Sequence, residues 1–276
     1  MARTRRKASR RTGICAAIFV CGSIWASAQS RELDSRARSA EFLVPFLVPG
    51  QEIDQVFSRT ISTSAEGLDP VVRRTSGTGM YRTLAISNDS YTFDSSFLYD
   101  GHPSARITTK IKRDGTESCW ESACASATDA SGLLFNSLLW GVAPKRIAVG
   151  STWRNKIAAP WELGPPGEQD VTVAALDIAA GTITLLRIGR GEGPFADDPG
   201  KITLTKDGKE YSMDAKSGAA KWSGYTTVTR GIIVSDELLV ERSLTLYSKE
   251  LGTLRATQRQ YILLNKMPHT EPVATG

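Results

Sequence analysis

The sequence predicts an all-β or mainly β protein: a curved antiparallel sheet, in the form of a half-barrel or a barrel-like meander, with one short helix. Short segments of alternating polarity recur along the chain with turn residues between them, which is typical of antiparallel sheet. In residues 105–112, Ile107, Thr109 and Ile111 fall on one side, while charged and polar residues fall on the other. One side of such a strand meets a core and the other meets water.

The turn residues are the second observation behind this fold class. Three dipeptides are typical of two-residue hairpins, since glycine readily takes the positive φ that these turns need. Residues 171–178 and 182–188 form a further predicted hairpin, and its apolar parity changes within each strand, which indicates a bulge or burial on both faces. The three dipeptides are Asp100-Gly101, Asp114-Gly115 and Asp207-Gly208.

The last two strands are predicted to be the longest, with their reversal at Leu251-Gly252. Alternate residues before and after this turn are apolar, and Arg242 is the exception in the first strand. The apolar positions are Leu238, Val240, Leu244 and Leu246, then Leu254, Ala256, Ile262 and Leu264.

One helix is predicted where apolar residues of 133–139 recur at helical spacing, with Ser131 placed to cap its start and Gly141 its end. It would cover one open end of the curved sheet. The predicted organisation follows from these elements: a cleavable signal over 1–28, a linker over 29–50, a single β-rich domain over 51–265 and a disordered tail over 266–276.

The N-terminus has the three regions of an export signal. Basic residues crowd positions 3–11, an apolar run covers 14–25, and Ala26-Ser27-Ala28 supplies the small residues that signal peptidase prefers. The apolar run is too short to span a bilayer. We therefore predict a periplasmic or secreted protein, cleaved between Ala28 and Gln29, with no transmembrane anchor after cleavage.

Removal of this segment changes the charge of the chain. The whole sequence has 34 Lys and Arg against 29 Asp and Glu, a formal net charge of +5. All six charged residues of the signal are basic, so the mature chain keeps 28 basic against 29 acidic side chains, a net charge of about −1. A basic chain would suggest a nucleic-acid partner. The nearly neutral mature chain does not, and no nucleic-acid partner is expected.

The mature chain keeps two cysteines, Cys119 and Cys124. An even pair in an exported chain indicates a disulfide. The four intervening residues suit a hairpin end, and so short a loop would stabilise the fold by roughly 2 kcal/mol. A redox pair is the alternative, but that chemistry favours Cys-x-x-Cys at a helix N-terminus.

No catalytic, cofactor or metal motif is found. A serine hydrolase would need a nucleophile near a histidine base, but Gly-x-Ser-x-Gly is absent and His102 is interpreted as a turn residue. Residues 189–193 are rich in glycine, yet no helix follows them to hold a phosphate, so they are interpreted as a flexible loop. Asp197 and Asp198 lack the spaced partners of a calcium loop.

Tryptophans are the candidates for a ligand pocket, because four of the five in the mature chain fall within 42 residues. Tryptophan is usually buried in cores, but indole rings with their N–H groups also line small-molecule sites. An arginine beside one of them would supply a polar group. The candidate pocket residues are Trp120, Trp140, Trp153, Trp161 and Arg154.

Three functions are compatible with these features. The first is a non-catalytic exported protein that binds an apolar ligand, a lipid or a partner peptide inside the curved sheet. By fold-level analogy it resembles the half-barrels that carry lipids or lipoproteins across the periplasm. The second is an exported glycan hydrolase with two converging carboxylates. The third is an envelope interaction module that uses an exposed sheet edge.

The export signal and the cysteine pair make one joint prediction for the secreted protein. Its intact mass should correspond to a chain that begins at Gln29 and is lighter than the reduced chain by one pair of hydrogen atoms, because Cys119 and Cys124 are joined. Alkylation should reach these cysteines only after reduction. A retained Met1, or labelling before reduction, would contradict the corresponding half of the prediction.

Overall fold

The computed structural model describes residues 36–103, 106–113, 117–120, 123–126, 140–158, 164–194 and 200–267, with the backbone alone at 117–120 and 123–126. The chain divides into two compact units, Met1–Ala37 and Arg38–Gly276, and the first contributes only Arg36 and Ala37 to the described residues. The predicted signal, the helix over 133–139, the turn Asp114-Gly115 and the tail from 268 lie outside the described residues.

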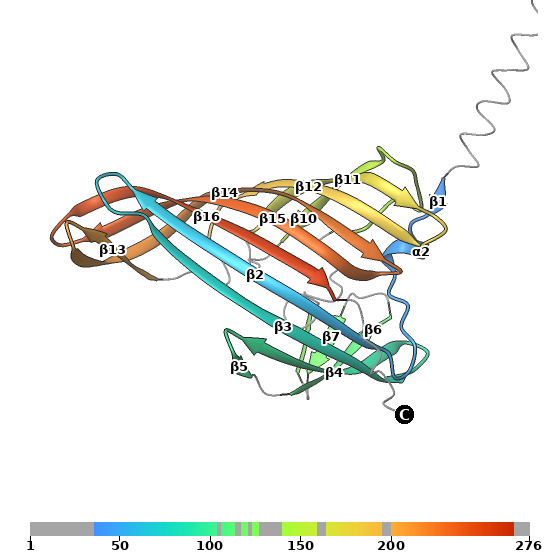
Figure 1. Cartoon of the computed structure of the whole chain (residues 1–276). Coiled ribbons are helices and arrows are strands. Elements are labelled where there is room, and N and C mark those ends of the chain that lie inside the picture. Colours follow the sequence, from blue (N-terminus) through green and yellow to red (C-terminus); the bar gives the residue numbers. More distant parts are fainter. Residues whose placement is uncertain are drawn as a thin grey trace, which may run out of the picture. The chain divides into compact units, whose positions relative to one another are not determined.

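The second unit is built almost wholly from β-strands, as Figure 1 shows. Its one described helix, α2 (Ala40–Leu43), is very short, and β1 (Ala37–Arg38) and β9 (Arg146–Ile147) lie outside the main sheet. The strands of that sheet are β2 (Glu52–Ala65), β3 (Val71–Ile86), β4 (Ser90–Tyr99), β5 (His102–Pro103), β6 (Ile107–Lys112), β7 (Glu117–Trp120), β8 (Ala123–Ser126), β10 (Thr152–Ile157), β11 (Gly167–Asp177), β12 (Thr182–Gly191), β13 (Lys201–Lys206), β14 (Lys209–Thr229), β15 (Ile232–Ser248) and β16 (Gly252–Lys266).

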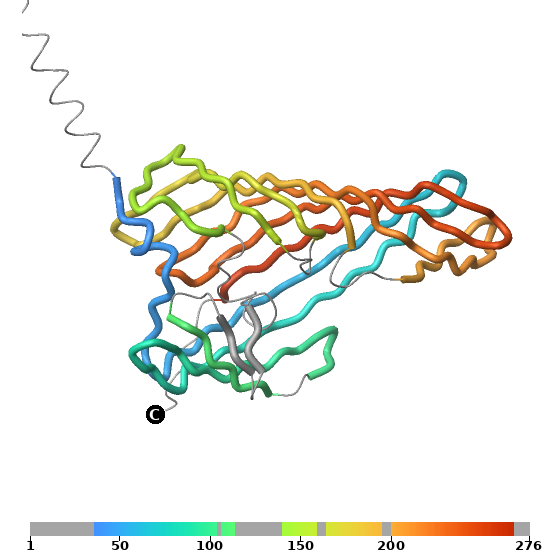
Figure 2. Tube along the Cα trace, turned by 180° about the vertical axis from the view of Figure 1, so that it is seen from behind, coloured from blue at the N-terminus to red at the C-terminus, as the bar shows by residue number. Residues whose placement is uncertain are grey.

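One antiparallel sheet of 14 strands therefore forms the described fold. Twelve of the strands follow one path, in the order β10-β11-β12-β14-β15-β16-β2-β3-β4-β6-β7-β8, and β13 and β5 pair at its side with β14 and β4. Figure 2 lets the same path be followed from behind. No ladder between described strands joins β10 to β8, so this sheet is open. The predicted all-β class and curved antiparallel sheet are confirmed.

The hairpins form where the turn residues predict them. Asp100 and Gly101 have φ values of 45° and 83°, and Asp207 and Gly208 have 50° and 77°, so both dipeptides take the left-handed conformations of a tight hairpin. The turn between β15 and β16 lies at Leu251-Gly252 as predicted.

The predicted hairpin of β11 and β12 also forms, and the change of apolar parity in β11 is due to a bulge. The register of the two strands shifts between Val173 and Ala175. This extra residue moves Leu176 to the face that Val171 and Val173 occupy, so the bulge keeps all three on one face.

Apolar side chains on one face of the sheet form two core clusters. The cluster at the β2–β3–β4 end contains Leu47, Ile53, Tyr81, Tyr91, Phe93, Ile111 and Ile232. The cluster at the tips of β15 and β16 contains Ile202, Leu204, Met213, Leu244, Leu246 and Ala256. In β15 the four apolar residues predicted to share a face are all buried, and Arg242 in the middle of them is buried too, at 3% exposure.

Residues 39–48, which fall within the predicted linker, pack against the sheet, and we call them the N-terminal strap. Phe42 and Leu47 are 1% and 2% exposed. The backbone N–H of Gly231 donates to the Phe42 carbonyl at 2.6 Å, and the Tyr91 hydroxyl donates to the Pro45 carbonyl at 2.7 Å. The strap thus joins the β14–β15 turn to β4 by buried hydrogen bonds.

Gly231 is the position where the strap demands glycine. Its φ is +77°, and a Cβ there would lie 2.3 Å from backbone atoms of Val44 and Pro45. Gly208 has the same φ of +77° with no atom within 4 Å of the Cβ position. A comparison of substitutions at the two glycines therefore separates two contributions to the free energy of unfolding: the left-handed backbone conformation and the close contact with the strap.

We expect Gly231→Ala to lower the free energy of unfolding by more than Gly208→Ala. Gly208→Ala should cost about 1 kcal/mol, the price of a left-handed alanine. Gly231→Ala should cost roughly 2–4 kcal/mol, because the strap must also move. Urea unfolding of the two variants measures both values, and equal losses would show that the strap contributes nothing at this contact.

Candidate functional site

The register assigns each strand residue to one of two faces. One row of directly opposed residues crosses eight strands, and opposed residues in an antiparallel sheet point to the same side. We call the side of this row the inner face, and the other side the outer face. The row consists of Trp153, Val171, Arg187, Gly224, Leu238, Ile262, Arg59 and Thr75.

A buried ion pair lies in the middle of the inner face. Arg187 donates from Nη2 to Oδ1 of Asp236 at 2.6 Å, and the Thr226 hydroxyl donates to the same oxygen at 2.6 Å. The side chains of Arg187 and Asp236 are 0% and 10% exposed. Gly224 of β14 lies opposite Arg187 of β12. Because glycine has no side chain, it leaves room for the long Arg187 side chain to reach Asp236 on β15. Nε and Nη1 of Arg187 have no hydrogen-bond acceptor among the described residues.

A second polar group, which we call the arginine–glutamine ladder, consists of Arg59, Thr63, Arg242, Gln258 and Gln260. Arg59 donates from Nε and Nη2 to Oε1 of Gln260 at 3.2 and 2.8 Å. Oε1 of Gln258 accepts from Arg242 Nε at 2.8 Å and from Gln260 Nε2 at 3.0 Å. The Gln258 amide donates in turn to the Thr63 hydroxyl at 3.0 Å. The two glutamines thus fix the orientation of two guanidinium groups.

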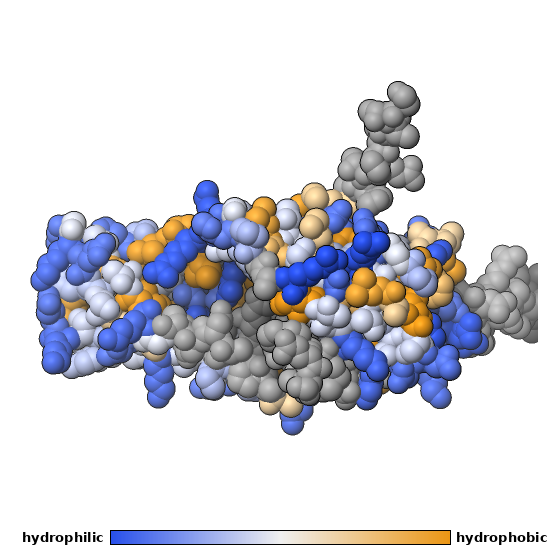
Figure 3. All heavy atoms as spheres, turned by 90° about the horizontal axis from the view of Figure 1, so that it is seen from below, coloured by the Kyte–Doolittle hydropathy of each residue, from blue (hydrophilic) through white to orange (hydrophobic). Residues whose placement is uncertain are grey.

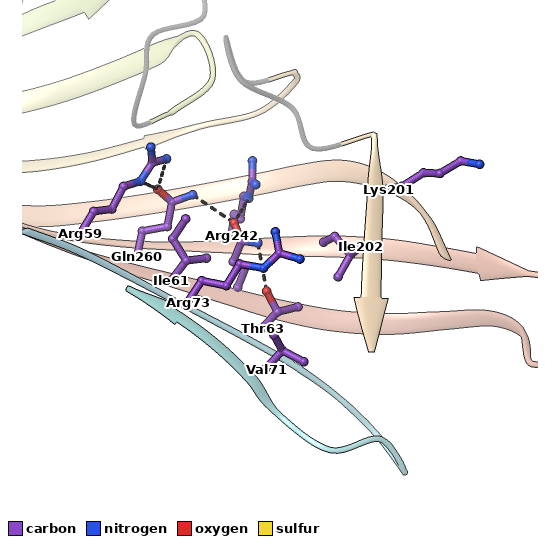
Figure 4. A pocket seen from close by; sticks show the side chains of 10 residues that line it. Arg59, Ile61, Thr63, Val71, Arg73, Lys201, Ile202, Arg242 and Gln260 are labelled. Carbon is purple, nitrogen blue, oxygen red and sulfur yellow. Dashed lines mark hydrogen bonds between the residues drawn. The ribbon is translucent and has the colours of Figure 1, made fainter. Parts of the chain in front are cut away.

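This ladder lines a cavity of about 110 Å³ on the inner face between β16, β2, β3 and β13. Figure 4 shows Arg59, Arg73 and Arg242 around its polar part, whereas the Lys201 side chain points away from them. Four of its ten lining residues are cationic and none of the ten is acidic. Ile61, Val71 and Ile202 provide its apolar wall. Among the described residues, the lining thus combines cationic, amide and apolar side chains.

Three cations of the outer face, Arg154, Lys221 and Arg259, meet carboxylates. Arg154 lies 3.0 Å from Asp170, and hydrogen bonding to this aspartate raises the pKa of the guanidinium. Glu241 accepts from Lys221 at 2.9 Å and from Arg259 at 2.8 Å, and these two hydrogen bonds lower its pKa. These three cations are therefore compensated within the sheet.

The structure brings together two of the predicted pocket residues. The Trp153 indole N–H donates to the Trp140 carbonyl at 2.6 Å, and the two side chains are 8% and 3% exposed. Arg154 does not join them, because neighbouring residues of β10 point to opposite faces, and it pairs with Asp170 and Glu168 on the outer face. The Trp120 side chain and Trp161 lie outside what the structure describes.

The backbone positions of Cys119 and Cys124 are compatible with the predicted disulfide. Cys119 of β7 stands directly opposite Cys124 of β8 in the antiparallel ladder. Opposed residues of such a ladder have Cα atoms about 4.5–5.5 Å apart, within the range that a disulfide spans. The bond itself stays a prediction.

The glycine-rich stretch over 189–193 is not the flexible loop that the sequence predicts, because its first three residues belong to β12. A Cβ on Gly189 would lie 2.3 Å from the Trp222 indole, which therefore packs directly over this glycine. The indole N–H donates to Oε1 of Gln169 at 2.9 Å. Gly189 therefore serves close packing on the inner face.

Two further features bear on the alternatives. In the described strands Asp236 is the acidic residue of the inner face, and it is held by Arg187 and Thr226 rather than by a second carboxylate. The edge strand β10 pairs only with β11 among described strands and carries exposed Arg154 and Lys156. Charges on an edge oppose pairing with another chain. No cluster of His, Cys, Asp and Glu within the described residues could hold a metal ion.

Sequence reasoning missed the arginine–glutamine ladder, although part of the signal was visible. Arg242 is the exception in an apolar face, and Gln258 and Gln260 continue the parity of Ala256 and Ile262. Polar residues at core parity on adjacent strands are unusual. Their mutual contacts, however, depend on the register between β15, β16 and β2.

Comparison with known proteins adds little to this geometry. No family model matches the sequence, and no curated protein matches it. Among solved structures, the chain is similar to Ail, the attachment invasion locus protein of Yersinia pestis, at 10% identity and a TM-score of 0.17. It is also similar to the loop L8 deletion mutant of OmpT, an outer membrane protein of Vibrio cholerae, at 9% identity and a TM-score of 0.23. Each match covers 80% of this chain and 100% of the other. At such TM-scores neither supports a conclusion about this chain.

Figure 3 shows one side of the molecule, where apolar side chains form several patches separated by hydrophilic ones. Among the described residues, no helix has the length and apolar character that crossing a membrane requires.

We expect Asp236→Ala to destabilise the protein by about 3–5 kcal/mol, because it leaves the Arg187 charge buried without its partner. Glu241→Ala is the matched control on the same strand: it also removes a carboxylate with two partners, but on the outer face, and should cost less than about 1 kcal/mol. Chemical denaturation measures both. The double variant Arg187→Met with Asp236→Leu should recover most of the stability lost in Asp236→Ala. If it does not, the unpaired charge of Arg187 is not the cause of that loss.

Proposed function

We propose that this chain is an exported, non-catalytic protein that binds an apolar ligand, a lipid or a partner peptide on the inner face of its curved sheet. One observation carries the proposal: the inner face combines large apolar side chains with a lined cavity and oriented polar groups. Small-molecule sites have this composition, since apolar walls supply affinity and a few fixed polar groups supply orientation.

Ile262, a partly exposed apolar residue of β16, marks where such a ligand would lie. Ile262 lies on the inner face beside Arg59, and Leu263 lies on the outer face beside Ser58. Both are half-buried, so both keep area for a further contact. The two neighbouring residues therefore allow the faces to be compared with nearly the same substitution.

The test uses the mature protein purified from the compartment to which it is exported. Native mass spectrometry should detect a co-purified apolar molecule, and titration with monoolein, a neutral lipid, should change the tryptophan fluorescence. Ile262→Gln should weaken monoolein binding about tenfold, because it removes one apolar contact of roughly 1.4 kcal/mol. Leu263→Gln should leave it unchanged.

Circular dichroism and thermal unfolding of both variants control for the fold. Absence of a co-purified molecule together with no response to monoolein would overturn the proposal. Equal weakening by the two substitutions would move the binding surface away from the inner face.

A further inference from the structure

We infer that the N-terminal strap is an autoinhibitory contact: the groove that holds residues 39–48 binds an extended apolar peptide of a partner protein, and the strap occupies this groove until the partner displaces it. The inference rests on the proposed function and deepens it by naming the partner peptide and its site. It is carried by the way the strap lies on the sheet, held by backbone hydrogen bonds and by alternate side chains.

Side chains of residues 43–48 alternate strictly between buried and exposed positions. In Figure 1 this part of the strap runs from the end of α2 toward the start of β2. The buried side chains are Leu43, Pro45 and Leu47, and the exposed ones are Val44, Phe46 and Val48. A period of two is typical of an extended peptide in a groove, where every second side chain enters the groove. The strap therefore lies on the sheet as a bound peptide would.

The sheet contacts the backbone of the strap from two elements. At the β14–β15 turn, the Gly231 N–H donates to the strap at 2.6 Å, and the neighbouring Arg230 carbonyl accepts from the Phe46 N–H at 3.0 Å. On β4, the Tyr91 hydroxyl donates to the Pro45 carbonyl at 2.7 Å. These groups meet main-chain atoms, which every peptide carries, so they supply affinity without depending on the side chains of the peptide.

Leu47 supplies the apolar part of the contact. It is 2% exposed and belongs to the core cluster at the β2–β3–β4 end. Five members of this cluster are inner-face residues that the strand ladders hold in place, namely Ile53, Tyr81, Tyr91, Phe93 and Ile111. Departure of Leu47 would expose their apolar area to water, and an aliphatic side chain of a partner would cover it again.

The strap can leave the groove without disturbing the sheet. A turn joins it to β2, and the Gln51 N–H donates to the Val48 carbonyl across this turn at 3.1 Å. Gly50 in the turn has a φ of +75° and no described atom within 4 Å of its Cβ position, so the backbone can rotate there. The ladders of β4 with β3 and β6, and of β14 with β15, contain no strap residue. Both walls of the groove therefore persist when the strap is displaced.

The strap itself shows the chemistry of the partner peptide. Residues 42–48 read Phe-Leu-Val-Pro-Phe-Leu-Val and contain no charged side chain. The proline at position 45 restricts its own backbone to extended conformations and so lowers the entropy that binding costs. We therefore expect the partner to present an uncharged, extended segment with aliphatic residues on either side of a proline, two positions from it.

The probe is a fluorescent synthetic peptide of residues 39–48, titrated into the full mature protein and followed by fluorescence anisotropy. Leu47→Gln in the protein weakens its own strap and leaves the groove unchanged. This variant should bind the peptide about tenfold more tightly than the wild type, because the strap competes less for the groove. A peptide that itself carries Leu47→Gln is the matched control and should bind both proteins more weakly.

Gly50→Ala gives a second test that changes neither the strap nor the groove. Alanine at this φ strains the turn while the strap is seated, so the variant should bind the peptide about fivefold more tightly than the wild type. Gly208→Ala is the matched control, because Gly208 has a φ of +77° with equally open surroundings in another hairpin, and it should leave binding unchanged. Thermal unfolding reports on the fold of every variant. A peptide with benzoylphenylalanine in place of Phe46 should cross-link near Arg230, which locates the bound peptide.

The outcomes separate this inference from the proposed function. Equal affinity of the peptide for the wild type, Leu47→Gln and Gly50→Ala shows that the strap does not compete with it, and the autoinhibitory contact is then wrong. If the peptide binds no variant while monoolein still binds, the peptide groove is wrong and the apolar-ligand function stands. If neither probe binds, both proposals fall. If sedimentation shows a wild-type dimer that excess peptide dissociates, a second copy of the chain fills the groove and the partner protein is wrong.

Discussion

The antiparallel register of the long central strands is the constraint on which the rest of the structure depends. β14 and β15 pair over most of their 21 and 17 residues, and the ladder continues without a break through β16 and β2 to β3. Side chains alternate between faces along every strand, so a slip of one residue would exchange the two faces. The register alone places Arg187, Asp236 and Arg242 on the side of the core.

Placing charged groups on a core face is costly, and the structure meets this cost with specific partners. Asp236 of β15 accepts hydrogen bonds from Thr226 on the adjacent strand β14 and from Arg187 on β12, one strand further, and Arg242 donates to Gln258 on β16. A buried ion pair is seldom more stabilising than apolar residues of the same volume, yet loss of one partner is severe. These hydrogen bonds therefore hold the charged groups in fixed positions on the inner face.

The sheet could be predicted from local patterns because its hairpins are local. The turn at Asp207-Gly208 needs only a residue pair that tolerates positive φ, and the bulge near Val173 left its trace as a change of apolar parity. The N-terminal strap could not be predicted this way, since Phe42 meets Gly231 across 189 positions of sequence. Arg154 was misleading for a related reason: it neighbours Trp153 in sequence but lies on the opposite face.

The sequence by itself determined the β class, the hairpin turns and the alternation of buried and exposed positions, because each depends on residues a few positions apart. It also marked Arg242 as a charge at an apolar position. Only the tertiary structure decided where that charge lies: Arg59, Arg73 and Arg242 come from three strands, and the pairing between those strands brings them to one cavity. Non-local pairing has no signature in a single chain, so the site became visible only when the sheet was assembled.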